Sequence, residues 1–516
     1  MILVKGSSQV EVENYANIET QKVATWARNN KTSFNDQKSK VLVITKKKPK
    51  NKRDIRIFLN NKKLQQTDTL KYLGITIDRR FNFNQHIENI TGKCIKTVYS
   101  LSKSAKINWG LKHEVLRIIY NGAILPIIAY GAPVWIECIK KKHNAHKIKR
   151  VQRLINLKIA RAYRTTSHEA LCVLTGITPI LIELENQANL YYRTRENEKN
   201  KQYDAPVHYS QWNHPAKALE IIRKTEGQEY TVEIYTDGSK NSGGVGSGIV
   251  IFENNHVPLQ LKYRLAPECS NNQAEQLAIV KALQTLRDFR HLQGLQRTAV
   301  VHTDSNITLD AIQNPRNHQR LIEQIREEIR ALENDKWSIH FTWVKAHNDN
   351  LGNEMADQLA KDAASNRDGE TVYSKIPKSA IIKEIKEKGE THWQQEWNAS
   401  TKGETTKSFF PNISERKSKR LQMGINLSTI VTGHGTLRSY YYRFKIKDDP
   451  TCVCRMGPQN SDHIIWECAL LQKQRDTLKN RIRKTGGNWP LTNSDLVNNY
   501  TKWFQMFVNS INFDTL

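Results

Sequence analysis

Two stretches of the chain each join a short apolar strand to an aspartate, and this pattern constrains the fold more than any other feature. One strand is predicted over Thr231–Thr236 and is followed by Asp237-Gly238-Ser239. The other is predicted over Thr298–Thr303 and is followed by Asp304. Strands of α/β sheets carry ligand chemistry at their carboxyl ends, so neighbouring strands would set the two carboxylates side by side. Either aspartate taken alone is equally explained as a turn former or helix N-cap.

Two further carboxylates belong to predicted helices. Apolar residues recur every four positions from Asn271 to Phe289, which places Glu275 at the N-terminal end of an apolar helix face. After a predicted strand over Trp337–Val344, a short Ala-rich helix carries Asp357. Four clustered carboxylates repel one another unless a cation lies among them, and oxygen ligands without Cys favour Mg²⁺ or Mn²⁺. Two such ions about 3.5–4 Å apart support hydrolysis of a phosphodiester.

These segments resemble type 1 ribonuclease H. The matching motifs are Ile-Tyr-Thr-Asp-Gly-Ser, Asn-Asn-Gln-Ala-Glu, His-Thr-Asp-Ser, and Trp-Val-Lys-Ala-His followed by Gly-Asn-Glu-Met-Ala-Asp. The resemblance implies a ribonuclease H-like fold over residues 229–367, with a mixed five-stranded sheet and flanking helices. It also implies that two Mg²⁺ (or Mn²⁺) ions are bound by Asp237, Glu275, Asp304 and Asp357.

The same resemblance assigns further roles. His347, on a flexible loop, would assist proton transfer or product release. The nucleic-acid-binding residues would be Ser239, Asn271, Asn272 and Gln273. The last three match a segment that contacts the minor groove of an RNA–DNA hybrid, where 2′-hydroxyls identify the RNA strand. Residues 306–336 lack the basic, Trp-bearing protrusion with which some family members hold substrate. We therefore expect another part of the chain to help bind the substrate.

Charge and composition indicate the class of partner. The 516 residues carry a formal net charge of +28, which favours a polyanionic partner bound in a salt-dependent way. Seven cysteines in so long a chain, with no signal peptide, predict a reduced intracellular setting, nuclear or cytoplasmic. No apolar run approaches the ~20 residues of a membrane span, so we expect no membrane partner.

The first 200 residues predict two different architectures. Residues 1–90 indicate mixed α/β structure, with a helix over Val10–Asn29, a strand over Lys40–Thr45 and strands near Ile55 and Tyr72. The basic run of residues 46–53 suits a nucleic-acid or nuclear-import signal, or a solvated loop. Residues 85–200 are predicted to be helical, and the basic amphipathic stretch His146–Arg161 suits either a nucleic-acid backbone or an ordinary surface helix.

Residues 1 to about 195 resemble non-LTR retrotransposon reverse transcriptases. The likeness rests on Phe34-Asn35, Leu70–Ile75, Leu125–Trp135, 150–153, 161–166 and 174–179. It implies a partial palm over residues 1–90 and a helical thumb over 91–200. In that family a catalytic Asp-Asp pair precedes a stretch like Ile2-Leu3-Val4, where this sequence begins. The only Asp-Asp pair is Asp448-Asp449, in a predicted C-terminal loop, so we expect no polymerase activity.

A linker is predicted over residues 201–228 and a basic C-terminal region over 368–516. Within the latter, residues 452–468 contain the pattern C-x-C-x8-H-x4-C, formed by Cys452, Cys454, His463 and Cys468. Three Cys and one His at this spacing suit a structural Zn²⁺ site, although buried thiols would explain the cysteines too. The pattern also resembles the Cys/His zinc knuckle of many non-LTR retrotransposon polyproteins. The other cysteines (Cys94, Cys138, Cys172 and Cys269) lie in apolar surroundings and are predicted core residues.

The sequence therefore predicts a multidomain α+β protein whose complete catalytic unit is a ribonuclease H. It would be an endoribonuclease that hydrolyses the RNA strand of RNA–DNA hybrids and binds other nucleic acid through its basic surface. The alternative is a catalytically silent nucleic-acid-binding remnant. A carboxylate at each of the four metal positions favours the enzyme.

Overall fold

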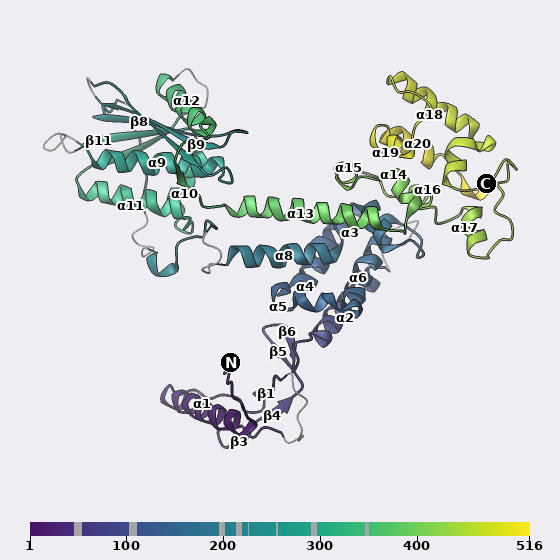
Figure 1. The fold of residues 1–516 in the computed structure, drawn as a ribbon, viewed down its shortest axis with the longest axis horizontal. Coiled ribbons are helices and arrows are strands. Elements are labelled where there is room, and N and C mark those ends of the chain that lie inside the picture. Colours follow the sequence, from purple (N-terminus) through teal and green to yellow (C-terminus); the bar gives the residue numbers. More distant parts are fainter. Residues whose placement is uncertain are drawn as a thin grey trace. The chain divides into compact units, whose positions relative to one another are not determined.

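The chain forms two compact units, each with its own core. The computed structural model describes residues 1–45, 54–102, 111–195, 202–212, 219–224, 227–253, 256–289, 297–345 and 350–516. The first unit combines Met1–Asn189 with Glu387–Leu516, and the second is Leu190–Lys386. Figure 1 labels many of the elements of both units.

The second unit is built on a seven-stranded mixed sheet in the order β13-β10-β9-β8-β11-β12-β7. Its strands are β7 (Ile222–Arg223), β8 (Val232–Lys240), β9 (Val245–Glu253), β10 (Leu259–Leu265), β11 (Thr298–Thr303), β12 (Ser338–Trp343) and β13 (Thr371–Tyr373). Strands β8, β9 and β10 pair antiparallel, whereas β8, β11, β12 and β7 pair parallel. The prediction of five strands omitted β7 and β13, because pieces of two or three residues are too short to show an alternating pattern.

Helices cover both faces of this sheet. They are α9 (Asn271–Arg287), α10 (Asn306–Gln313), α11 (Arg320–Asn334) and α12 (Leu351–Ser365), with the short 3-10 helix η4 (Tyr209–Gln211) before them. Successive strand residues point to opposite faces. Accordingly, Ile234 packs in the main core with α9 and α11, while Tyr235 packs in a second cluster with Ala356 of α12.

Glycines on β9 let α12 lie close to the sheet. A Cβ at Gly248 would stand 2.0 Å from the carbonyl oxygen of Ala356, and one at Gly246 would stand 2.4 Å from that of Ala360. Real Cβ atoms do not approach backbone so closely. Glycine at these two positions therefore fixes how near α12 comes to β8 and β9, which matters for the carboxylate that α12 carries.

The first unit begins with α1 (Gln9–Asn29) and three two-stranded pairings. The strands are β1 (Lys40–Leu42), β2 (Phe58–Leu59), β3 (Lys62–Lys63), β4 (Gln65–Thr67), β5 (Thr69–Tyr72) and β6 (Ile75–Asp78). Strand β1 is shorter than the predicted Lys40–Thr45, and Ile55 lies before β2 as a buried residue. The basic run of residues 46–53 lies outside the described residues.

A helical region with its own core follows. Its elements are α2 (Asn84–Ser102), α3 (His113–Ile119), the π-helix η1 (Tyr120–Ile124), α4 (Leu125–Ala129), α5 (Ala132–Trp135), the 3-10 helix η2 (Ile136–Lys140), α6 (Lys142–Ala160), α7 (His168–Thr175) and α8 (Ile180–Thr194). The apolar face of the basic amphipathic stretch, on α6, is buried in this core through residues such as Ile148 and Val151.

The length and hydropathy of the helices bear on whether any of them could span a membrane. Within the described residues, no single helix is both long and apolar enough to cross a membrane. One bent pair, His113–Ala129 with Ala132–Lys140, meets the criterion by length and composition alone.

The C-terminal residues build a core together with the helices before the sheet unit. The elements are α13 (Lys378–Ala399), α14 (Glu404–Phe409), α15 (Ile413–Ser418), α16 (Ile425–Thr432), α17 (Arg438–Arg443), η7 (His463–Glu467), η8 (Ala469–Leu471), α18 (Gln472–Lys484), α19 (Asn493–Asn498), α20 (Thr501–Asn509) and η9 (Phe513–Thr515). Trp397 and Phe504 of this part share one apolar cluster with Leu171 of α7. The Asp448-Asp449 pair lies in an exposed loop after α17.

Candidate functional site

The register of the central sheet brings the first two predicted carboxylates level with each other. The sequence predicts that this strand ends at Thr236, just before Asp237. In the structure β8 continues to Lys240, because antiparallel β9 pairs with it as far as that residue. Its parallel neighbour β11 does end, at Thr303, which lies opposite Thr236. Asp304 is therefore the first residue beyond β11 and lies level with Asp237 inside β8.

The lack of a side chain at Gly238 allows the helix that carries the third carboxylate, Glu275, to lie against β8. A Cβ at this position would stand 2.5 Å from the backbone nitrogen of Glu275, so the start of α9 lies directly on β8. The first turn of α9 is held by a capping box, in which Ser270 and Gln273 each bond the other's backbone N–H. Glu275 follows this turn and is buried with 4% of its surface exposed.

The three carboxylates form one compact, buried cluster. Carboxyl oxygens of Asp237, Glu275 and Asp304 all lie within 4.8 Å of one another. Burial, together with the charges of Asp304 and Asp357, raises the pKa of Asp237 to about 7. Burial and the charges of Asp237 and Asp304 raise the pKa of Glu275 well above its ordinary value.

This cluster fits a divalent cation. Glu275 Oε2 is buried and accepts no hydrogen bond within the described residues. A buried carboxylate oxygen left without a donor costs free energy unless a cation or proton compensates it. An all-oxygen donor set is the kind that Mg²⁺ and Mn²⁺ prefer.

The remaining two predicted catalytic residues are placed differently. Asp357 of α12 lies outside the group of three, but its charge and hydrogen bond contribute to the raised pKa of Asp237. Its Oδ2 also accepts a hydrogen bond from Lys361 Nζ at 2.5 Å. His347 lies outside the described residues.

Known proteins match this unit. The family model described as RNase H matches residues 229–365. A ribonuclease H of Pseudoalteromonas translucida (strain TAC 125) is 31% identical over 156 residues, which cover 27% of this chain and 94% of that protein. The chain belongs to the ribonuclease H family. The prediction of a ribonuclease H-like fold with a mixed sheet is thereby confirmed.

Longer relatives come from retrotransposons. The Pol polyprotein of the type-1 retrotransposable element R1 4 of Nasonia vitripennis is 29% identical over 208 residues, covering 37% of this chain and 52% of the polyprotein. The Pol polyprotein of element R1 2 from the same organism is 26% identical over 193 residues. The match covers 37% of this chain and 47% of that polyprotein. The chain thus spans about half the length of these curated relatives. The matches confirm the resemblance to non-LTR retrotransposon polyproteins.

The predicted nucleic-acid-binding residues of this ribonuclease H divide into two groups. Asn271 and Asn272 are exposed in the first turn of α9, beside Glu275, and Ser239 is half-buried at the end of β8. Gln273 instead is buried, and its Nε2 donates to Asp204 Oδ2 at 2.6 Å and to the Lys375 carbonyl at 3.1 Å. Its side chain serves the internal structure of the protein, which differs from the predicted surface role.

Asp204 is a residue of the site's support that sequence reasoning missed. It is buried and accepts hydrogen bonds from Gln273 and, at 2.9 Å, from the Tyr373 hydroxyl. A bridge between Tyr203 and Ile376 lies beside it. These contacts tie segments on both sides of residues 229–365 to the helix that carries Glu275. No local pattern signals them, because Asp204 lies 69 residues from Gln273.

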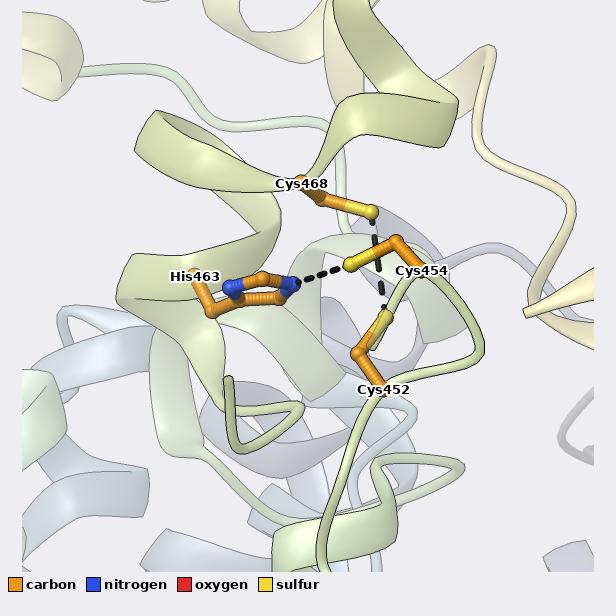
Figure 2. Close-up of side chains that lie close together, drawn as sticks. All are labelled: Cys452, Cys454, His463 and Cys468. Atoms are coloured by element: carbon orange, nitrogen blue, oxygen red, sulfur yellow. Dashed lines mark hydrogen bonds between the residues drawn. The ribbon is translucent and has the colours of Figure 1, made fainter. Parts of the chain in front are cut away.

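A second candidate metal centre lies in the first unit. One ligand atom from each of Cys452, Cys454, His463 and Cys468 lies within 4.8 Å of the others. Figure 2 shows these four side chains pointing toward one another. The Cys452 and Cys468 sulfurs are 3.8 Å apart, and Cys454 Sγ is 3.2 Å from His463 Nε2. Sulfurs bound at about 2.3 Å to one tetrahedral Zn²⁺ lie about 3.8 Å from each other. The donor set therefore fits zinc, whereas a disulfide would need about 2.05 Å.

Neighbouring groups tune this cluster. His463 Nδ1 lies 3.2 Å from Glu467 Oε2, which orients the ring so that Nε2 faces Cys454. Burial would raise the pKa of Cys454, but hydrogen bonds from the Met456 backbone, Cys452 and His463 together lower it to about 7. Glu467 was not singled out in the sequence, although its spacing of four from His463 on a helix is a usable signal.

The four remaining cysteines are core residues, as predicted. Cys94, Cys138, Cys172 and Cys269 are all buried and unpaired by disulfides.

Proposed function

We propose that this protein is an endoribonuclease that hydrolyses the RNA strand of RNA–DNA hybrids. The observation that carries the proposal is the cluster of Asp237, Glu275 and Asp304, whose oxygens lie within 4.8 Å of one another around a buried, unpaired Glu275 oxygen. Carboxylates this close repel one another, and a bound cation would relieve that repulsion. The curated relative named ribonuclease H supports the same activity.

The predicted carboxylates and His347 have catalytic roles in this proposal. Asp237, Glu275, Asp304 and Asp357 would hold two Mg²⁺ or Mn²⁺ ions. Ions bound there supply the charge that activates a water and stabilises the leaving 3′-oxygen of the cleaved phosphodiester. The products would carry 3′-hydroxyl and 5′-phosphate ends. His347 would assist the accompanying proton transfer.

Selection of the RNA strand would come from the start of α9. Asn271 and Asn272 are exposed beside Glu275, so their amides can contact 2′-hydroxyls of the strand whose phosphate lies at the carboxylates. Ser239, at the end of β8, would contribute a further contact. Duplex DNA would bind through the basic charge of the chain without being cut, because it lacks the 2′-hydroxyls.

We also propose that Cys452, Cys454, His463 and Cys468 bind one structural Zn²⁺. The support is the closeness of their ligand atoms, which lie within 4.8 Å of one another, and the carboxylate of Glu467 on the far side of the histidine. Residues 1–90 and 91–200 would correspond to the palm and thumb segments of the retrotransposon relatives.

The decisive experiment is a cleavage assay on an RNA–DNA hybrid labelled in its RNA strand, with and without Mg²⁺. We expect cleavage that requires the metal and spares both duplex DNA and free RNA. Hybrid binding without cleavage at any Mg²⁺ or Mn²⁺ concentration would instead identify a catalytically silent binding protein.

A further inference from the structure

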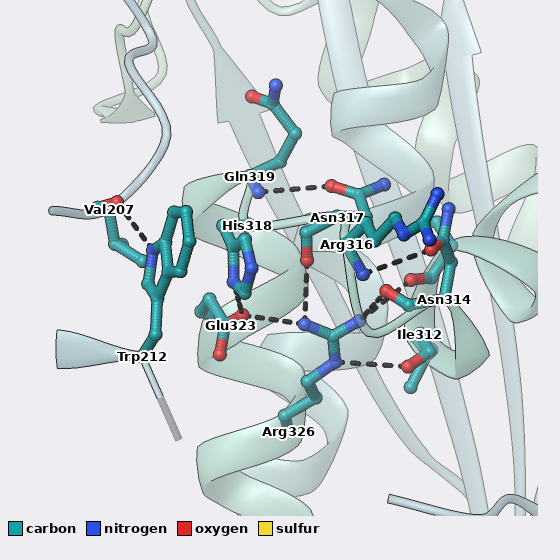
Figure 3. Close-up of polar contacts among 11 residues, drawn as sticks. Val207, Trp212, Ile312, Asn314, Arg316, Asn317, His318, Gln319, Glu323 and Arg326 are labelled. Atoms are coloured by element: carbon teal, nitrogen blue, oxygen red, sulfur yellow. Dashed lines mark hydrogen bonds and ion pairs between the residues drawn. The ribbon is translucent and has the colours of Figure 1, made fainter. Parts of the chain in front are cut away.

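A pocket away from the carboxylates lies in the sheet unit, between η4 and the loop that joins α10 to α11. Its volume is about 460 Å³, within the ~300–1,000 Å³ of small-ligand sites. The residues that line it include Trp212, Asn314, Arg316, Asn317, His318 and Gln319. Aromatic, amide and guanidinium groups therefore line one open pocket, and Figure 3 shows their side chains in close-up.

The aromatic floor of this pocket is rigidly built. The indole of Trp212 stacks on the His318 ring with centroids 3.7 Å apart and planes 7° from parallel. Trp212 Nε1 donates to the Val207 carbonyl at 3.0 Å, and the Val207 N–H donates to the His318 carbonyl at 2.9 Å. The segment that contains η4 is thereby fastened to the loop of residues 314–319.

A buried ion pair holds the loop from beneath. His318 Nδ1 lies 2.9 Å from Glu323 Oε1, and the same oxygen accepts a hydrogen bond from Arg326 at 2.6 Å. Arg326 also donates to four backbone carbonyls, those of Ala311, Ile312, Asn314 and Asn317. The negative charge of Glu323 is thus neutralised inside the protein, and the pocket surface keeps the positive charge of Arg316.

The groups that face the pocket retain unused binding capacity. Asn314 and Asn317 each accept one backbone N–H through the side-chain oxygen, from Arg316 and Gln319 respectively. Within the described part of the chain, their amide NH₂ groups and the Arg316 guanidinium form no hydrogen bond or ion pair. Because His318 covers one face of the indole and Trp212 is still 46% exposed, the other face is available for stacking.

We infer that this pocket binds unpaired nucleotides of a single strand that extends from the nucleic acid held at the carboxylates. One base would stack on the open face of Trp212, and on the other side of His318 the asparagine amides and Arg316 would contact the sugar and phosphate of an adjacent nucleotide. Stacking of bases on aromatic side chains combined with basic groups is the general mode of single-strand binding. A polar lining of this kind does not suit an apolar ligand.

The position of the pocket supports a nucleic-acid occupant. Helix α10 begins two residues after Asp304 and ends one residue before Asn314. The eight residues of α10 span about 12 Å at 1.5 Å per residue, roughly the rise of three or four base pairs. This inference rests on the proposed function for the identity of the ligand as nucleic acid. The pocket would also help to bind the substrate, since residues 306–336 lack the basic protrusion that some family members use for this.

The test compares variants of the full chain in two assays. The first measures binding of a fluorescein-labelled, ten-nucleotide oligo-dT, which ribonuclease H does not cut, over a series of salt concentrations. We expect Trp212→Ala to weaken binding about 5- to 150-fold and Trp212→Phe to restore most of it. Arg316→Gln, which disturbs no internal contact, should lower the slope of log affinity against log salt by about 0.7. Trp26→Ala, which removes an indole that is 57% exposed in the other unit, is the matched control.

The second assay measures cleavage of blunt hybrids and of hybrids with a single-stranded DNA tail at either end. Trp212→Ala should raise KM for a tailed hybrid and leave the blunt hybrid unchanged. If the wild-type chain cuts no hybrid, the proposed function fails while the oligonucleotide assay still tests the pocket. Wild-type oligonucleotide affinity in both Trp212→Ala and Arg316→Gln, with unchanged melting temperatures, would overturn the inference. Saturable binding of free AMP without oligonucleotide binding would overturn it too.

Discussion

At the scale of single residues, the main feature of the site is the electrostatic repulsion among its buried carboxylates. Asp237 and Glu275 are buried beside each other and beside Asp304, so their charged forms are disfavoured and the pKa of both is raised. Because the pKa of Asp237 is about 7 in the folded protein, against 3.8 ordinarily, the folded state binds protons more tightly than the unfolded state. Protonation therefore stabilises the fold, and this contribution is lost as pH rises from about 4 through 7.

The first prediction concerns this pH dependence. Without divalent metal, the melting temperature of the sheet unit should fall between pH 6 and pH 8, since Asp237 must ionise among other carboxylates. Added Mg²⁺ should raise the melting temperature more at pH 8 than at pH 6, because at pH 6 protons compete for the same oxygens. Thermal unfolding with and without Mg²⁺ measures both effects, and Asp237→Asn should reduce them. An equal Mg²⁺ effect at the two pH values would contradict the proposed ligand role.

The second prediction concerns catalysis. Asp237→Asn or Asp304→Asn removes a ligand charge, and metal stabilisation of a developing charge is worth several kcal/mol, so kcat should fall at least about a hundredfold. Hybrid affinity should persist or increase, because one repulsion of the phosphates is removed. Single-turnover cleavage and binding under identical conditions separate the two effects. Asp310→Asn, on the exposed side of α10, is the control and should behave like wild type.

At the scale of elements, the site depends on how closely helices approach the sheet. Glycines at 238, 246 and 248 leave room for α9 and α12, and an added Cβ would fall within 2.5 Å of helix backbone at each of these positions. The hydrogen bonds among Asp204, Gln273 and Tyr373 then fix the start of α9. The carboxylates of the candidate site are thus positioned by packing between elements as much as by their own strands.

The third prediction tests this packing. Gly238→Ala should destabilise the sheet unit by about 1–3 kcal/mol, the usual cost of overpacking, and should reduce hybrid cleavage because α9 must shift with Glu275. Gly92→Ala is the matched control, since nothing lies within 4 Å of a Cβ there and alanine favours a helix. Chemical denaturation and cleavage assays report the two effects. Full activity with unchanged stability in Gly238→Ala would contradict the described contact.

At the scale of the whole molecule, the two candidate metal sites lie in different compact units. The carboxylates belong to the unit Leu190–Lys386, whereas the Cys/His cluster belongs to the other unit. Cys452 and Cys468 are part of an apolar core that also contains Leu157, Leu171 and Trp397. Loss of zinc would therefore loosen a core shared by residues far apart in the sequence.

The fourth prediction follows from this separation. Cys454→Ser should lower the zinc content measured on the purified protein and lower the melting temperature of the first unit, because zinc binding is coupled to folding. The kcat of hybrid cleavage should remain within about twofold of wild type, since the carboxylates and the Cys/His cluster belong to different units. Cys94→Ser, at a buried cysteine outside the cluster, separates metal loss from general core damage. Wild-type protein free of zinc after purification in reducing buffer would refute the assignment.

Local signals in the sequence were sufficient for the motifs and for most elements. The helix of Glu275, strand β11 and the Cys/His spacing were predictable because each depends on residues a few positions apart. The sequence by itself thus determined the ribonuclease H fold and nominated the carboxylates. Contacts between residues far apart in the sequence determined the other features. Strand β8 continues past Asp237 because β9 pairs with it. The Gln273 side chain points inward because it donates a hydrogen bond to Asp204, 69 residues away. The stacked rings of Trp212 and His318 are 106 residues apart in the sequence, and no sequence pattern in either segment predicts their contact. Sequence periodicity records only which face of an element is apolar, whereas tertiary packing determines which distant partner that face and its polar neighbours meet.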